Sequence, residues 1–68
     1  MKLYVLTGQR NKGKCYVHNI LILNLYDMLI ETTYDREYAE PMPKYLAEAI
    51  QRYYNKKNKG FLSLEELL

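Results

Sequence analysis

The stretch from Pro43 to Gly60 constrains the fold most, because its start signal, its period and its stop signal all indicate one helix. Proline suits the first helical position, where its missing N–H leaves no bond unmade, and it disfavours helix in the residue before it. Lysines crowd the far end, where the helix dipole favours cations, and Gly60 can adopt the left-handed conformation that ends a helix. The sequence therefore predicts a helix over residues 43–58.

Apolar residues in this helix recur at the i, i+3, i+4 and i+7 spacing of a single face, which we expect to pack on the core. They are Leu46, Ala49, Ile50 and Tyr53. A neighbouring stripe combines tyrosines with positive charge, and we expect it to contact a partner. Its residues are Tyr45, Arg52, Tyr54, Lys56 and Lys59.

Two stretches before the helix favour β structure. Residues 2–8 contain β-branched and aromatic side chains and end in glycine, and residues 14–22 resume the same composition after a polar connector that contains Gly13. An antiparallel hairpin of these two stretches is the economical interpretation. A helix that starts soon after Gly13 remains an alternative, since periodicity alone does not assign a short apolar run.

From Asn24 onward the polar residues fall within one narrow arc of a helical wheel, and apolar residues fill the rest. The polar set is Asn24, Asp27, Glu31 and Asp35. This pattern predicts a central core helix that ends near residue 39. The β-branched pair Thr32 and Thr33 weakens that helix, so a third strand over residues 28–34 stays open as an alternative.

Ser63 and Glu66 form the spacing of a capping box, which predicts a short helical turn at the end of the chain. Leu64, Leu67 and Leu68 then group on one side, as part of the core or as an interface. The predicted fold class is α+β: an N-terminal β-hairpin packed against two antiparallel helices, plus a short C-terminal helical turn. We expect residues 1–68 to form a single small domain, because a chain of this length has room for one core.

Composition limits the classes of function. A formal net charge of +2 is too mild to indicate nucleic acid by itself. A lone cysteine, Cys15, cannot form an internal disulfide, so we expect a reducing, cytoplasmic compartment. We expect no secretion signal, because the apolar run over residues 3–6 is shorter than the roughly 7–15 residues of a signal-peptide core. We expect no membrane span, since the apolar run over residues 20–30 is interrupted by Asn24 and Asp27 and is shorter than the ~20 residues that cross a bilayer.

The stretch from Gly8 to Cys15 resembles the P-loop of nucleotide-binding NTPases: glycine, four residues, glycine and lysine. In that family the loop amides cradle phosphates and the lysine that matches Lys14 contacts them. Cys15 replaces the hydroxyl residue that ligates Mg²⁺, and the chain is too short for the parallel sheet of that family. We therefore interpret the stretch as a basic hairpin loop.

Residues 55–66 resemble an EF-hand calcium loop in the placing of Gly60 and Glu66. Lys57 and Lys59 occupy positions where the family has oxygen ligands, and their ammonium groups repel a cation. His18 and Cys15 lie three residues apart, but the chain offers no further histidine or cysteine to complete a metal or catalytic site. The sequence thus predicts no metal, no cofactor and no enzymatic activity.

The function favoured by these observations is a non-enzymatic protein–protein interaction module, a small regulator or inhibitor that occupies a partner protein's surface. Eight tyrosines in 68 residues suit recognition, because each ring combines apolar area with a polar tip. The acidic residues Asp27, Glu31 and Asp35 and the basic stripe of the helix can steer a partner protein or a second copy of the chain. The composition also has the style of phage and mobile-element proteins.

Nucleic-acid binding is the less favoured alternative. Its first candidate contacts are Arg10, Lys12 and Lys14 in the hairpin loop. They would act together with Arg52 and Lys56, and neighbouring tyrosines could stack on bases. The acidic residues argue against a uniformly attractive surface.

Overall fold

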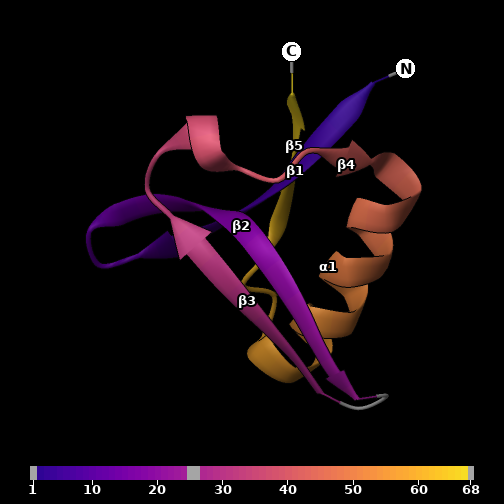
Figure 1. Ribbon diagram of the computed structural model, residues 1–68. Helices are drawn as coiled ribbons and strands as arrows, with labels where there is room; N and C mark the ends of the chain where they lie inside the picture. Colours follow the sequence, from indigo (N-terminus) through magenta and orange to yellow (C-terminus); the bar gives the residue numbers. More distant parts are fainter. Residues whose placement is uncertain (1, 25–26, 68) are drawn as a thin grey trace.

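A computed structural model describes residues 2–24 and 27–67, and it folds them into an antiparallel sheet with one helix across it (Figure 1). The elements are β1 (Leu3–Arg10), β2 (Gly13–Asn24), β3 (Asp27–Thr33), a 3-10 turn η1 (Arg36–Tyr38), β4 (Met42–Pro43), α1 (Lys44–Asn58) and β5 (Ser63–Leu67). The strand order is β3-β2-β1-β4, and β5 also pairs with β1.

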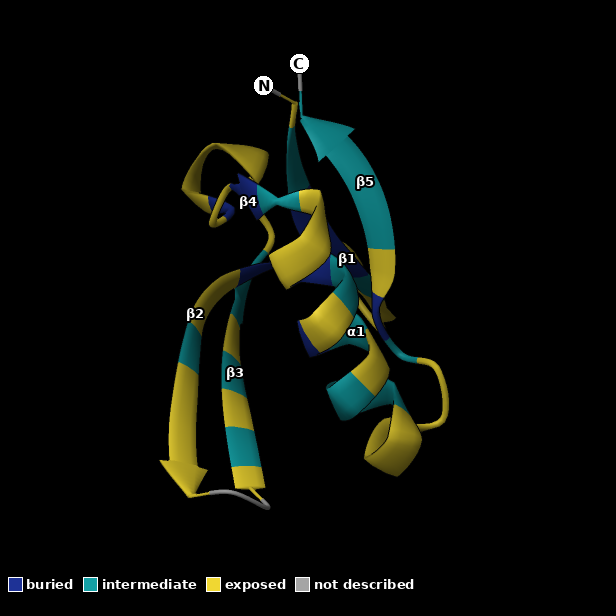
Figure 2. Cartoon of the chain, turned by 90° about the vertical axis from the view of Figure 1, so that its right-hand side faces the viewer, coloured by how far each residue is buried: buried dark blue, intermediate teal, exposed yellow. Residues whose placement is uncertain are grey.

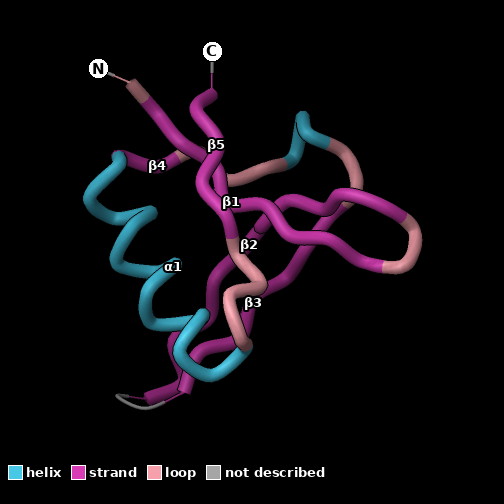
Figure 3. Tube along the Cα trace, turned by 180° about the vertical axis from the view of Figure 1, so that it is seen from behind, coloured by secondary structure: helices cyan, strands magenta, loops and turns pink. Residues whose placement is uncertain are grey.

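Strand β1 lies at the centre of the sheet and is paired on both edges. On one edge it pairs with β4 at Leu3 and Tyr4 and with β2 from Thr7 onward. On the other edge β5 runs antiparallel to it from Leu3 to Thr7, so the described ends of the chain lie side by side (Figure 3). Val5 and Leu6, in the middle of β1, are fully buried.

The core fills the space between the sheet and α1. Its buried side chains are Leu6, Val17, Met42, Ala47, Ile50 and Leu62. Residues on opposite strands of an antiparallel pair share a face, and the β1–β2 register puts Leu6 and Val17 on the face that α1 covers. In Figure 2 the buried residues gather around β1 and the adjoining side of α1.

The helix is confirmed with nearly the predicted bounds. Pro43 is the extended residue just before it, and the left-handed conformation begins at Lys59 (φ 50°) and continues at Gly60 (φ 73°). The predicted core face is partly wrong, because Ala47 and Ile50 are buried whereas Leu46 is 41% exposed. The spacing of apolar residues does not decide which of two overlapping helix faces packs on the core. The direction in which β4 leads into the helix decides it.

The N-terminal hairpin is confirmed. Its register runs from Thr7 opposite Tyr16 to Arg10 opposite Gly13, which leaves a turn of two residues. Gly13 has a φ of 123°, a backbone conformation that residues other than glycine rarely adopt. Strand β2 continues to Asn24, so the alternative helix after Gly13 is wrong.

The predicted core helix after Asn24 is wrong. The predicted packing of the hairpin against two antiparallel helices is therefore wrong as well. The described part of this segment forms β3, close to the alternative strand over residues 28–34, and then η1. Residues 25 and 26 of that helix lie outside the described residues. The strand carries apolar side chains on both faces, which imitates the broad apolar arc of a buried helix. Because strands outnumber helices in the described chain, the α+β description holds only in part.

The predicted C-terminal helical turn is also wrong. Ser63 and Glu66 belong to β5, where five residues pair with β1. The exposed edge of β1 offers backbone hydrogen bonds to a whole strand, whereas a capping box satisfies the ends of a single turn. Leu64 packs against the core, and residue 68 of the predicted leucine group lies outside the described residues.

Asn55 secures the connection from α1 to β5, a role that the sequence did not indicate. Its side chain accepts a hydrogen bond from the Leu62 N–H (2.8 Å) and donates one to the Leu62 carbonyl (2.9 Å). The Gln51 amide donates to the same carbonyl at 3.1 Å. Leu62 is only 2% exposed, so these side chains satisfy backbone groups that water does not reach easily.

We predict that Asn55→Ala lowers the free energy of unfolding by about 1–3 kcal/mol, since it leaves the Leu62 N–H without a partner, whereas the Leu62 carbonyl keeps its hydrogen bond from Gln51. The matched control is Asn58→Ala, because the Asn58 amide donates to the Tyr54 carbonyl (2.9 Å) at an exposed site. Urea denaturation followed by circular dichroism measures both variants. Equal destabilisation by the two substitutions would contradict the prediction.

Candidate functional site

The distal halves of β2 and β3 project from the rest of the molecule as a two-stranded arm, defined here as residues 18–24 and 27–31 (Figure 2). Much of its surface is exposed, although it is rich in large apolar side chains. The exposed apolar residues are Leu21 (44%), Ile22 (72%), Leu23 (55%) and Leu29 (51%). An exposed cluster of this kind marks an interaction surface in many proteins.

The strand register divides the arm into two apolar faces. On the inner face, toward α1, Ile22 lies opposite Met28, and the next pair toward the base is Ile20 opposite Ile30. Ile20, Met28 and Ile30 pack against the core. On the outer face Leu21 lies opposite Leu29, and beside them the Asn19 amide donates to a Glu31 carboxylate oxygen at 3.0 Å.

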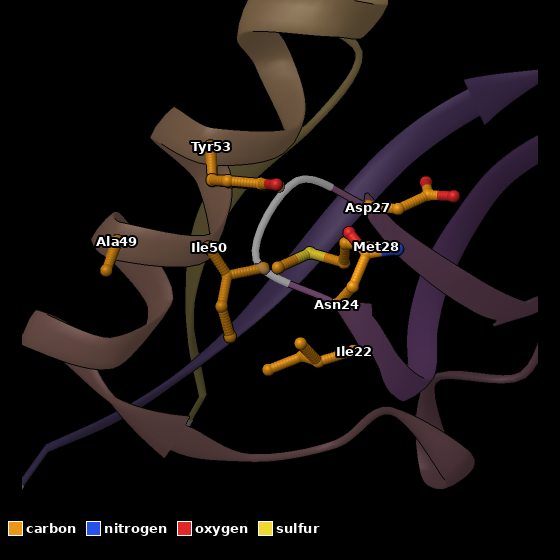
Figure 4. A pocket seen from close by; sticks show the side chains of 7 residues that line it. All are labelled: Ile22, Asn24, Asp27, Met28, Ala49, Ile50 and Tyr53. Carbon is orange, nitrogen blue, oxygen red and sulfur yellow. The ribbon is translucent and has the colours of Figure 1, made fainter.

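An open groove of about 630 Å³ separates the inner face of the arm from α1. Its lining residues are Ile22, Asn24, Asp27, Met28, Ala49, Ile50 and Tyr53 (Figure 4). Met28 and Ile50 point toward one another across it, and the Tyr53 side chain reaches from the helix toward the arm. Three residues of the predicted core stripe thus line this groove, and of these only Ile50 is buried.

Positive charge borders the helix wall of the groove. Arg52 follows Ala49 by three positions and Lys56 follows Tyr53 by three, which places both beside the apolar wall on the helix surface. Both are exposed, and the Lys57 ammonium lies 5.7 Å from the centroid of the Tyr53 ring. Of the basic stripe that the sequence predicted, Arg52 and Lys56 therefore lie beside the groove, whereas Tyr54 packs against the core and Phe61. Tyr45 is 75% exposed.

The predicted acidic residues do not share a helix face. Asp27 and Glu31 are exposed on β3, and the Asp27 carboxylate points away from the groove (Figure 4). Asp35 has a structural role, because its side chain accepts a hydrogen bond from the Glu37 N–H at 3.0 Å and caps η1. The acidic residues therefore divide between the arm and the η1 cap.

The candidate nucleic-acid residues are partly separated. The Arg10 guanidinium lies 5.1 Å from the centroid of Phe61, whose ring lies 6.3 Å from that of Tyr54. The structure thus gathers Arg10 and Tyr54 around Phe61, a residue that the sequence did not single out. Lys12 lies exposed in the turn, whereas Lys14 pairs with Glu65.

The two motif resemblances do not persist in the structure. Residues 8–15 form the paired ends of β1 and β2 with a tight turn, and residues 55–66 pass from a helix into a strand. Cys15 is fully buried, while exposed His18 donates through Nδ1 to the Tyr38 carbonyl at 2.8 Å, since a carbonyl can only accept. Among the described residues no group of three or more histidine, cysteine or acidic side chains could hold a metal.

Membrane crossing by a helix finds no support in the described part of the chain. No helix there combines the length and the apolar character that a bilayer span requires.

Comparisons with known proteins give no relative: no protein-family model, curated protein or solved structure matches this chain.

A charged cluster joins β2, β5 and η1. Lys14 contacts one carboxylate oxygen of Glu65, and Arg36 Nε donates to the other at 3.2 Å. The hydrogen bond from Lys14, reinforced by the one from Arg36, holds the pKa of Glu65 below its usual value, although partial burial acts in the opposite direction. The same hydrogen bond raises the pKa of Lys14.

We predict that Glu65→Gln removes part of the pH dependence of stability on the acid side. A carboxyl group whose pKa is lowered by folding stabilises the protein above its unfolded pKa of about 4.3, and this contribution disappears as pH falls through the folded pKa. The variant should therefore lose stability relative to the native chain at pH 6 and approach it at pH 2–3. Thermal unfolding across this pH range measures the difference.

The control for that measurement is Glu66→Gln, because Glu66 pairs with Lys2 at 3.2 Å and leaves the Lys14–Glu65–Arg36 cluster intact. A gap between Glu65→Gln and the native chain that stays constant with pH would contradict the assignment.

Proposed function

We propose that this chain is a protein-interaction module that binds an amphipathic segment of a partner protein in the groove between the arm and α1. The observation that carries the proposal is the open apolar groove itself, with Ile22 on its rim at 72% exposure. Such a module acts by occupying a partner's surface, as a small regulator or inhibitor does. Recognition of an apolar helix face in a groove is a recurrent mode of binding between proteins.

The free energy for binding would come from apolar burial. The chain exposes 5004 Å², whereas a compact monomer of its mass exposes about 4,500 Å². A projecting arm increases the exposed surface area, as this difference requires. Covering one large exposed aliphatic side chain contributes about 1.5–3 kcal/mol. Burial of several groove residues together would have to exceed the entropy that association costs.

Charge defines the chemistry of the partner. Arg52 and Lys56 border the helix wall, so a ligand segment with acidic residues beside its apolar face would complement them. These charges lie on the rim, where they steer association more than they add affinity. The proposal places the module in the cytoplasm, on the ground that a lone buried cysteine suits a reducing compartment.

We predict that Ile22→Lys and Ala49→Lys, one on each wall of the groove, each weaken partner binding at least tenfold. Each change puts an ammonium group into the apolar interface, where its desolvation is costly. The partner is first identified with a photo-crosslinking residue at position 22, and its purified form is then titrated by calorimetry. Leu21→Lys, on the outer face, is the matched control and should bind like the native chain.

Two results would overturn the proposal. One is native affinity in both groove variants. The other is the absence of any crosslinked protein that depends on the position of the photo-reactive residue, tested against the same residue at position 21.

Nucleic-acid binding remains a second candidate because of one observation, the grouping of Arg10 and Tyr54 around Phe61. Single-stranded nucleic acid is bound by aromatic rings that stack on bases within a basic surface. Lys12 in the adjacent turn would add to the positive charge.

If this candidate is right, a mobility-shift titration with a single-stranded oligonucleotide should show binding that weakens steeply as salt is raised. Arg10→Glu should then reduce affinity by at least tenfold. Lys2→Glu makes the same change of charge at the other end of β1 and should have a smaller effect. No shift at low salt would exclude this candidate.

A further inference from the structure

Strand β3 forms one edge of the sheet. In the strand order β3-β2-β1-β4 it lies at the end and pairs with β2, and within the described ranges no other strand lies against it. Its seven residues run from Asp27 to Thr33, long enough to offer several backbone N–H and C=O groups along the outer edge. Such an edge is a template for another strand.

Strand β3 has few of the usual protections of an edge strand, and its only charged residues are Asp27 and Glu31. It contains no proline, lysine or arginine, and its central residues Met28, Leu29 and Ile30 are apolar. The two register shifts of the arm fall between Val17 and Asn19 and between Ile22 and Asn24, so the extra residues belong to β2. The outer edge of β3 is therefore left without a bulge of its own.

We infer that a second copy of this chain pairs with that edge, β3 against β3, antiparallel and with a two-fold axis through Ile30. An isologous contact of this kind requires a segment that is complementary to itself. Residues opposite one another must share a face, so the axis passes through a residue position and only a few registers are available.

Charge selects among these registers. An axis through Leu29 would place Asp27 of each copy opposite Glu31 of the other. An axis through Glu31 would place the two Glu31 residues opposite one another. Like charges directly opposite are destabilising. With the axis through Ile30, all seven residues pair. Asp27 then lies opposite Thr33, and Glu31 lies opposite Leu29.

The Ile30 register also covers apolar surface on both faces of the arm. On the inner face Ile30 meets Ile30 of the second copy, and on the outer face the two Leu29 side chains become diagonal neighbours. Leu29 is 51% exposed in the single chain, so pairing would remove apolar area from water. The groove lies between the inner face and α1 rather than at the β3 edge, and this inference is independent of the proposed function.

Sedimentation equilibrium over a range of protein concentrations tests the dimer. We expect the native chain to associate to a two-chain species, and Leu29→Glu to raise the dissociation constant at least tenfold, because each copy then places a carboxylate directly opposite Glu31 of the other. Leu21→Glu, on the same face but one strand further in, should have a smaller effect. A monomer at all concentrations up to 1 mM, or equal effects of the two variants, would overturn β3 pairing.

Disulfide crosslinking tests the register. Directly opposite residues have Cα atoms about 4.5–5.5 Å apart, within disulfide reach, whereas diagonal neighbours are about 7–8 Å apart. Under mild oxidation Ile30→Cys should therefore form a covalent dimer much faster than Leu29→Cys. The native chain, whose Cys15 is buried, should not crosslink.

Faster crosslinking of Leu29→Cys, or no crosslinking of either variant at concentrations where the dimer forms, would overturn the Ile30 axis. Far-UV circular dichroism and near-native urea midpoints establish that each variant is folded. A chain that is monomeric but still binds a partner in the groove would refute the dimer and leave the proposed function standing.

Discussion

The pairing of β1 on both of its edges is the constraint on which the rest of the structure depends. Once β5 occupies one edge and β2 and β4 share the other, Val5 and Leu6 have no contact with water. Strands from both ends of the chain thereby become neighbours. A small chain buries little surface, and a central strand of this kind concentrates burial where backbone hydrogen bonds are also satisfied.

This arrangement determines where the helix can lie. Met42 and Pro43 pair with β1 and lead directly into α1, so the helix must cross the face that carries Leu6. Asn55 then returns the chain to the sheet through Leu62. The helix covers the base of β2 and β3 but leaves their distal halves beside an open groove. The candidate site is thus a consequence of a sheet that is longer than the helix can cover.

Local signals in the sequence identified the elements whose structure depends on near neighbours. The helix after Pro43 and the hairpin that turns at Gly13 were predicted correctly, because a proline, two glycines and a lysine-rich end act within a few residues. The segment after Asn24 was misassigned, since apolar residues on both faces of a strand resemble the broad face of a buried helix. The capping box at Ser63 likewise did not produce a helical turn, because residues 63–67 pair with the free edge of β1.

For the candidate site, the exposed basic stripe at Arg52 and Lys56 was readable from the sequence, because helix periodicity separates a charged face from an apolar one. The groove was not, since its second wall comes from a strand about 25 residues away in the chain. By itself, then, the sequence determined the helix, the first hairpin and the placement of positive charge. Tertiary structure alone decided the partners of β1 and the exposure of the arm, because strand pairing depends on edges that distant segments supply.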